Sequence, residues 1–197
     1  MGAKSTNVMN RRDALSRVAL IMGGTIIGAE AFLSGCKTTP SYGGSLKFTP
    51  EEIAYLNEIA ETIIPKTNTP GAKDAQVGEF MQVIVNDCYE EKDQKIFLEG
   101  MGKLDKACKD KYGKGFVECT PEQRKEFLTA LDKEAKDYSG KKKNEDPAHY
   151  FSMMKQLTLW GFFTSKPGAT EALRYEAVPG RYDGCIPYKK GDKAWAT

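Results

Sequence analysis

The chain has 197 residues and a formal net charge of +2, and 40% of its residues are hydrophobic. Its excess of basic residues lies before position 36, so residues 36–197 carry equal numbers of basic and acidic side chains. A neutral domain has no basic face that could release counterions from phosphates, and this excludes a typical nucleic-acid-binding protein. Residues 36–197 are long enough to form one domain with a hydrophobic core.

The N-terminal residues 1–35 are typical of an export signal. Arg11 and Arg12 precede an apolar stretch at residues 18–32, which is too short to cross a bilayer as a permanent helix. Because adjacent arginines come before a run that glycines make only moderately apolar, the pattern favours the twin-arginine route, which carries folded proteins. Ala14 stands where a phenylalanine is usual in this signal, so ordinary secretion of an unfolded chain stays open as the alternative.

The apolar stretch is followed by a sequence that is similar to a bacterial lipobox: Leu33, Ser34, Gly35, Cys36. In such a signal the cysteine receives a diacylglyceryl group and becomes the first residue of the mature protein. We therefore expect a lipid on Cys36, with residues 36–47 as a polar tether to the membrane. Several acyl chains anchor stably, because each buried methylene contributes about 0.8 kcal/mol. The alternative is a buried free cysteine at the end of a membrane-anchoring helix.

Helical periodicity dominates the rest of the chain and predicts an all-α fold over residues 48–197. Apolar residues at spacings of three and four mark five expected helices, and the second has the clearest pattern. After Lys166 the chain is rich in glycine, proline and tyrosine and loses this periodicity. We expect an irregular bundle of about five helices with a long irregular C-terminal arm. The apolar patterns of the five helices lie at residues 53–64, 77–88, 96–112, 127–131 and 150–163.

Two of the expected helices open with the same capping signal. Thr49 and Thr120 are each followed by a proline and, three positions later, by Glu52 or Gln123. A threonine cap, a proline in the first turn and an acid or amide three residues after the cap are typical of a helix start. The first helix is expected to end before Pro65.

Four cysteines remain if Cys36 is lipidated, and their pairing stays open. An even number of cysteines in an exported chain permits disulfides, and four cysteines allow three connectivities. Free cysteines in the core are the alternative, and Cys88 falls on the apolar stripe of the second expected helix. The spacings include no short pair of the kind that holds structural zinc. The four residues are Cys88, Cys108, Cys119 and Cys185.

The sequence provides little material for catalysis, and we expect no catalytic residue and no metal site. His149 is the only histidine, so a histidine-based triad or a multi-histidine metal site has at most one member. We interpret His149 as a surface or capping residue at the start of the fifth helix. The sequence has no phosphate-binding Gly-Lys-Ser/Thr loop, no dinucleotide fingerprint and no motif for covalent haem.

Two loops and one helix carry a resemblance to a known family. Turn chemistry accounts for their prolines and glycines one at a time. In this order and combination, over about residues 48–188, they resemble the gluconate 2-dehydrogenase subunit 3 family. The motifs are Glu61, Thr62, Ile63, Ile64, Pro65 through Pro70, Gly71, Ala72; then Trp160, Gly161, Phe162, Phe163, Thr164, Ser165; and the ending Tyr175, Pro179, Gly180, Tyr182, Gly184, Cys185.

The resemblance implies an accessory subunit that binds no cofactor itself. Members of this family pair with a large flavoprotein of the glucose-methanol-choline type, which holds FAD and oxidises a sugar, sugar acid or glycoside. A c-type cytochrome with haem c often accepts the electrons, and the small subunit commonly carries the only export signal. A leader suited to folded cargo on a chain without catalytic residues agrees with this implication.

The leading hypothesis is a non-catalytic subunit that exports, stabilises and tethers an FAD-dependent dehydrogenase in the cell envelope. The chain would face the periplasm on a lipid anchor, and Lys37 after the lipid cysteine favours the outer membrane. A stand-alone envelope lipoprotein with a ligand-binding or scaffolding role is the alternative, and an independent enzyme is the weakest. Aromatic side chains supply much of the energy of protein interfaces. The expected partner contacts are therefore in the arm, and the alternative is that the arm folds back on its own bundle. The residues are Tyr175, Pro179, Gly180, Tyr182, Tyr188 and Trp195.

Overall fold

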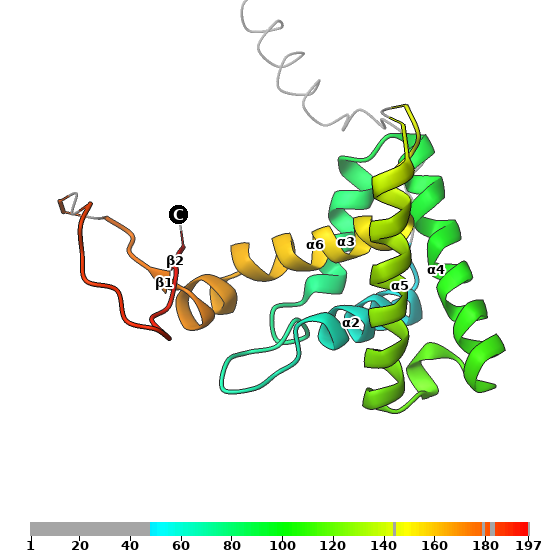
Figure 1. Cartoon of the computed structure of the whole chain (residues 1–197), viewed down its shortest axis with the longest axis horizontal. Coiled ribbons are helices and arrows are strands. Elements are labelled where there is room, and N and C mark those ends of the chain that lie inside the picture. Colours follow the sequence, from blue (N-terminus) through cyan, green and yellow to red (C-terminus); the bar gives the residue numbers. More distant parts are fainter. Residues whose placement is uncertain (1–47, 144, 179, 182–183, 197) are drawn as a thin grey trace, which may run out of the picture. The chain divides into compact units, whose positions relative to one another are not determined.

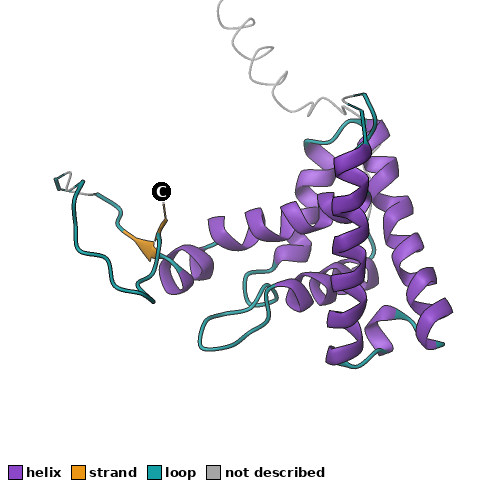
Figure 2. Ribbon diagram, in the orientation of Figure 1, coloured by secondary structure: helices purple, strands orange, loops and turns teal. Residues whose placement is uncertain are grey.

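The computed structural model describes residues 48–143, 145–178, 180–181 and 184–196. Over these residues the chain is mostly helical, with almost no strand, which confirms the all-α fold (Figures 1 and 2). Several of the expected features lie outside the described residues. They are the export signal with Arg11 and Arg12, the lipid site Cys36, the tether, and the arm residues Pro179 and Tyr182.

The described part of the chain contains five α-helices, one for each apolar pattern of the sequence, but the last residues of the first two patterns, Ile64 and Cys88, lie just beyond the helix ends. Two short helical turns and two short strands complete it. The helices are α2 (Pro50–Ile63), α3 (Val77–Asp87), α4 (Glu91–Tyr112), α5 (Pro121–Lys141) and α6 (Tyr150–Thr164). The shorter elements are η1 (Phe116–Glu118), η2 (Gly168–Ala172), β1 (Arg174–Tyr175) and β2 (Trp195–Ala196).

Both predicted capping signals form the expected reciprocal hydrogen bonds. The hydroxyl of Thr49 accepts from the Glu52 N–H at 3.2 Å, and the Glu52 carboxylate accepts from the Thr49 N–H at 2.8 Å. Thr120 and Gln123 repeat the arrangement at the start of α5, with distances of 3.3 and 3.0 Å. These bonds satisfy backbone donors that have no partner inside the helix, so the two helix starts are fixed locally.

The expected burial of Cys88 is wrong. The helix α3 ends at Asp87, and Cys88 is its C-cap with a φ of −116°. Because the chain leaves the helix there, Cys88 does not continue the apolar stripe of Met81 and Val85, and its side chain is exposed.

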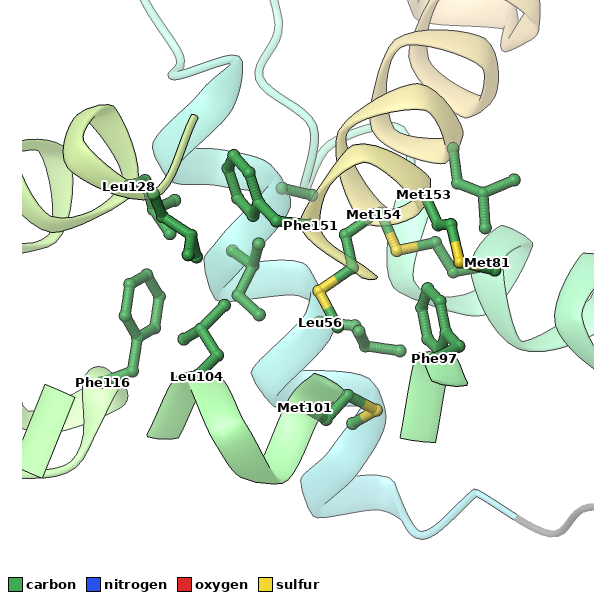
Figure 3. Packing of buried hydrophobic residues seen from close by; sticks show 14 of the residues in the cluster. Leu56, Met81, Phe97, Met101, Leu104, Phe116, Leu128, Phe151, Met153 and Met154 are labelled. Atoms are coloured by element: carbon green, nitrogen blue, oxygen red, sulfur yellow. The ribbon is translucent and has the colours of Figure 1, made fainter. Parts of the chain in front are cut away.

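The core forms where α2 packs against α3, α5 and α6, and α4 packs against α3 and α6. Figure 3 shows side chains from α2, α3, α4, η1, α5 and α6 pointing toward one another. Leu56 of α2, Phe97 of α4 and Met154 of α6 are fully buried in this cluster. Burying a side chain of this size contributes about 1.5–3 kcal/mol relative to leaving it in water, so the shared core is what holds the helices together.

The arm begins with η2 and the strand β1, and it returns at β2, which pairs with β1 in parallel. Arg174 of β1 is in register with Trp195 of β2, and the Arg174 N–H donates to the carbonyl oxygen of Ala194 at 2.8 Å. The guanidinium carbon of Arg174 lies 4.6 Å from the centre of the Trp195 ring, a cation–π contact. Two segments that are separated in the sequence are therefore joined at the base of the arm.

Candidate protein-binding surface

His149, the only histidine, serves as the N-cap of α6. Its Nδ1 accepts a hydrogen bond from the Phe151 N–H at 3.2 Å, which requires an unprotonated Nδ1. Burial lowers the pKa of His149 and outweighs the opposing effect of Glu134, whose carboxylate lies 3.8 Å from Nε2. The structure thus confirms the capping interpretation and gives the imidazole a structural role.

Within the described residues, no three His, Cys, Asp or Glu side chains are placed so that they could hold a metal ion. A search of the same residues finds no helix with the length and apolar character needed to cross a membrane. The feature that stands out on this part of the molecule is apolar surface.

Large exposed apolar side chains are unevenly distributed over the described residues. Apart from Val117 in η1, they lie on α3, on the second half of α6 and in the arm. Single exposed apolar residues are ordinary, but several close together usually mark a binding surface. The set on α3 and α6 is Val83, Leu159, Trp160 and Phe163, and the set in the arm is Tyr175, Val178, Ile186, Tyr188 and Trp195.

We call Leu159, Trp160 and Phe163 the α6 face. Leu159 and Phe163 are four residues apart, so they are neighbours on one side of the helix, and Trp160 is three residues before Phe163. Trp160 is 50% exposed, although its ring packs edge-to-face with the Phe80 ring of α3 at a centroid distance of 5.5 Å. The helix thus holds a large aromatic ring in a fixed position while half of it faces water.

A close approach between α3 and α6 positions this ring. Gly161 follows Trp160, and a Cβ at position 161 would lie 2.6 Å from a ring carbon of Phe80. The absence of a side chain at Gly161 therefore lets Phe80 pack directly against α6, next to Trp160. This gives the Trp-Gly-Phe-Phe motif of the sequence a packing role.

Charged side chains border the α6 face. Leu159 and Trp160 also line a shallow groove whose other lining residues come from α5 and α6. In this groove Asp132 pairs with Lys136 at 2.8 Å and with Lys155 at 2.5 Å. Hydrogen bonds from these two lysines hold the pKa of Asp132 below its ordinary value, so it is ionised at neutral pH. An apolar centre with a charged border is the usual anatomy of a protein interface.

In the arm, the described contact residues expected from the sequence are all exposed, but they lie in different local structures. Tyr175 lies opposite Ala196 in the strand pair and Trp195 lies opposite Arg174, and Tyr175 and Trp195 are 54% and 47% exposed. Gly180 is exposed and has open space around it. Tyr188 is 77% exposed. The arm thus presents aromatic surface to solvent, as the α6 face does.

Comparison with known families decides what kind of chain this is. Residues 50–180 match the model of the family described as gluconate 2-dehydrogenase subunit 3. The chain belongs to this family. Gluconate 2-dehydrogenase subunit 3 is an accessory subunit of a gluconate 2-dehydrogenase-like complex, so a dehydrogenase subunit is its partner. Searches of curated proteins and of solved structures found no match.

The matched range covers all of one exposed apolar surface and only part of the other. It starts at the first residue of α2 and contains the whole α6 face, together with Tyr175 and Gly180. It ends before Tyr188 and Trp195. Because pairing with a dehydrogenase is a property of the family, the surface that serves it is better sought within residues 50–180. The α6 face was not predicted from the sequence, because Trp160 and Phe163 fit the pattern of an aromatic helix equally well as core residues and as surface residues.

The loop between α2 and α3, which carries the first motif of the family, is held at two points by the carboxylate of Glu61. The oxygens of Glu61 accept from the N–H of Lys66 at 2.8 Å and from the N–H of Lys73 at 2.9 Å. A Cβ at Gly71 would lie 2.5 Å from both carboxylate oxygens, so only glycine leaves them room. Ala72 is fully buried beside this arrangement. These motif residues shape the loop and give it a fixed path between the two helices.

Proposed function

We propose that this subunit exports, stabilises and tethers a flavoprotein dehydrogenase of the glucose-methanol-choline type. The partner would hold FAD and oxidise a CH–OH group of a sugar, sugar acid or glycoside. A c-type cytochrome carrying haem c would be a third component that accepts the electrons. In this proposal the small subunit contributes a binding surface, an export signal and a membrane anchor, and the chemistry takes place in the partner.

The α6 face is the observation that carries this proposal. It is a fixed aromatic and aliphatic surface within the matched residues, and Trp160 remains half exposed although it packs on Phe80. Covering it with a partner would remove large apolar side chains from water, at about 25 cal/mol per Å² of apolar surface. Aromatic residues held rigidly in this way are the residue type that dominates binding energy at interfaces.

The leader supplies the signals for export and membrane attachment in this proposal. Arg11 and Arg12 would direct the folded complex through the twin-arginine route, and a lipid on Cys36 would hold it on a membrane, facing the periplasm. Lys37 follows the lipid cysteine and favours the outer membrane. One export signal on the small subunit would then direct both proteins to the envelope.

Co-purification from the native envelope tests the pairing. The full chain with a C-terminal tag is purified in mild detergent, and the expected product is a complex that contains a flavin-bearing subunit. The visible absorbance of the flavin identifies this subunit, with about one flavin per complex. Recovery of the tagged chain alone, without flavin, would contradict the proposal and favour a stand-alone envelope lipoprotein. A Cys36→Ser variant is expected to keep the flavoprotein but to appear in the soluble periplasmic fraction.

Export of the partner tests whether the two proteins share the export signal of the small subunit. Replacing Arg11 and Arg12 by lysine keeps the charge of the signal but removes the arginine pair that the twin-arginine route reads. We expect both the subunit and the dehydrogenase activity to remain in the cytoplasm. Normal appearance of the flavoprotein in the envelope of this variant would show that it carries a signal of its own.

A further inference from the structure

Two of the four described cysteines lie in contact inside the core. Sγ of Cys108 and Sγ of Cys119 are 3.4 Å apart. Cys108 belongs to the last turns of α4, and Cys119 follows η1 as its C-cap. Their exposed fractions are 0% and 4%, whereas Cys88 and Cys185 are exposed. Of the four cysteines, this is the pair whose sulfurs the fold brings together.

Backbone and side-chain contacts on both sides hold the two sulfurs in place. After α4 the chain reverses at Gly113, whose φ of 70° is in the left-handed region that suits glycine. The turn is fastened back to α4 by Asp105, whose carboxylate accepts from the Phe116 N–H at 3.0 Å. Beyond the turn, Nε of Arg124 donates to the carbonyl oxygen of Cys119 at 3.0 Å. The contact between the sulfurs is therefore a consequence of a well-braced corner.

We propose that Cys108 and Cys119 form a disulfide that links the end of α4 to the start of α5. A disulfide has a sulfur–sulfur bond of about 2.05 Å, so the two sulfurs must move closer by roughly 1.4 Å for the bond to form. Among the three connectivities that the sequence leaves open, this choice leaves Cys88 and Cys185 outside the bond.

The bond forms by thiol–disulfide exchange with a disulfide-bearing oxidant, such as glutathione disulfide or an envelope oxidase. One cysteine thiolate attacks the oxidant to give a mixed disulfide and one released thiol. The second cysteine thiolate then attacks the mixed disulfide and releases the second thiol. The two cysteines lose two electrons and two protons, and the oxidant is reduced to two thiols.

The surroundings of Cys108 favour thiol–disulfide exchange before the turn from α4 through η1 is packed in its folded position. Burial and the neighbouring Cys119 raise the pKa of the Cys108 thiol to about 12, so in the folded, reduced protein the Cys108 thiol stays protonated at neutral pH. The attacking thiolate therefore forms while the segment around η1 is open, during folding or a local opening. Once formed, the bond is enclosed by the core and shielded from reductants.

Equilibration of the full chain in a glutathione buffer tests the proposal without depending on export. The purified protein is unfolded and reduced in denaturant, refolded in a buffer that contains glutathione and glutathione disulfide, quenched with N-ethylmaleimide in denaturant and digested with trypsin. We expect a linked pair of peptides, one from residues 107–109 and one from residues 115–124, that separates on reduction. Free, alkylated Cys108 and Cys119, or a link from either residue to Cys88 or Cys185, would overturn the proposal.

Labelling of the native reduced protein tests the burial on which the proposal rests. Before oxidation, N-ethylmaleimide should modify the exposed Cys88 and Cys185 at least tenfold faster than the buried pair, because reaction needs an accessible thiolate. Equal labelling of all four would contradict the placement of the two sulfurs.

Thermal unfolding with matched variants measures the effect of the bond. Closing a loop of this length should raise the Tm of oxidised over reduced protein by roughly 5–10 °C. The double variant Cys108→Ala/Cys119→Ala should show no difference between the two conditions, and Cys88→Ser/Cys185→Ser should keep the full difference. A redox difference that survives in the first variant, or disappears in the second, would assign the disulfide to other cysteines.

Discussion

At the scale of single residues, the carboxylate of Glu58 joins three segments of the chain. It lies on α2, accepts from Nη1 of Arg124 on α5 at 2.5 Å, and pairs with Lys73 of the loop before α3. Burial raises the pKa of Glu58, but the hydrogen bond and charge of Lys73, together with Arg124, outweigh burial and leave this pKa below its ordinary value of 4.5.

The lowered pKa predicts a loss of stability in acid. A carboxyl whose pKa is lower in the folded than in the unfolded protein contributes stability above the unfolded pKa, and the contribution disappears as the pH falls through the folded pKa. We expect the free energy of unfolding to decrease as the pH falls below 4.5. Glu58→Gln should be less stable at neutral pH by about 1 kcal/mol and should lose less than the wild type on acidification.

Urea unfolding at a series of pH values measures this contribution. Glu99→Gln is a matched control, because within the described residues Glu99 pairs with exposed Lys95 and Lys103 on its own helix. Exposed pairs of this kind contribute little, so the control should follow the wild-type pH dependence. Equal behaviour of the Glu58 and Glu99 variants would show that the three-segment contact does not stabilise the fold.

At the scale of helices, two glycines of α4 have opposite roles. A Cβ at Gly100 would lie 2.4 Å from Cβ of Tyr150 on α6, whereas a Cβ at Gly102 would meet no atom within 4 Å. We expect Gly100→Ala to destabilise the protein by about 1–3 kcal/mol, because α4 and α6 must move apart. Gly102→Ala should stabilise it by roughly 0.5–1 kcal/mol, because alanine is the better helix former. Thermal unfolding of the two single variants measures both signs, and a shift in the same direction for both would contradict this packing.

The same glycines show how far sequence reasoning reaches at this scale. Helix starts such as Thr49 and Thr120 are local signals, and their hydrogen bonds form as predicted. A glycine within a helical pattern lowers helix propensity wherever it stands, so the sequence treats Gly100 and Gly102 alike. Only the position of Tyr150 on another helix distinguishes them. Cys88 is mistaken for a core residue for a related reason, because periodicity does not mark the residue at which a helix ends.

At the scale of the whole molecule, family membership and the all-α fold are predictable from the sequence, and the binding surface is not. Motifs such as Trp160-Gly161-Phe162-Phe163 identify the family without revealing which ring is covered. In the structure Phe162 is 2% exposed and Phe163 is 40% exposed. Which side of α6 remains open depends on how α3 and α5 pack against it, and no single helix pattern contains that information.

This arrangement predicts that binding of the dehydrogenase depends on the α6 face more than on the end of the arm. Leu159→Glu places a charge within an apolar contact, and an unpaired charge there should weaken capture of the flavoprotein at least tenfold, about 1.4 kcal/mol or more. Val117→Glu is the matched control, because Val117 is similarly exposed but lies on η1. It should capture the flavoprotein as the wild type does.

Quantitative co-purification, with thermal unfolding to verify that each variant is folded, decides between the two surfaces. Trp195→Ala removes an exposed aromatic side chain of the arm that lies beyond the matched residues. If the α6 face is the main contact, Trp195→Ala should reduce capture less than Leu159→Glu does. A larger loss for Trp195→Ala would place the main contact in the arm. Loss with Val117→Glu alone would move it to the corner formed by η1, on the segment that the proposed Cys108–Cys119 bond closes.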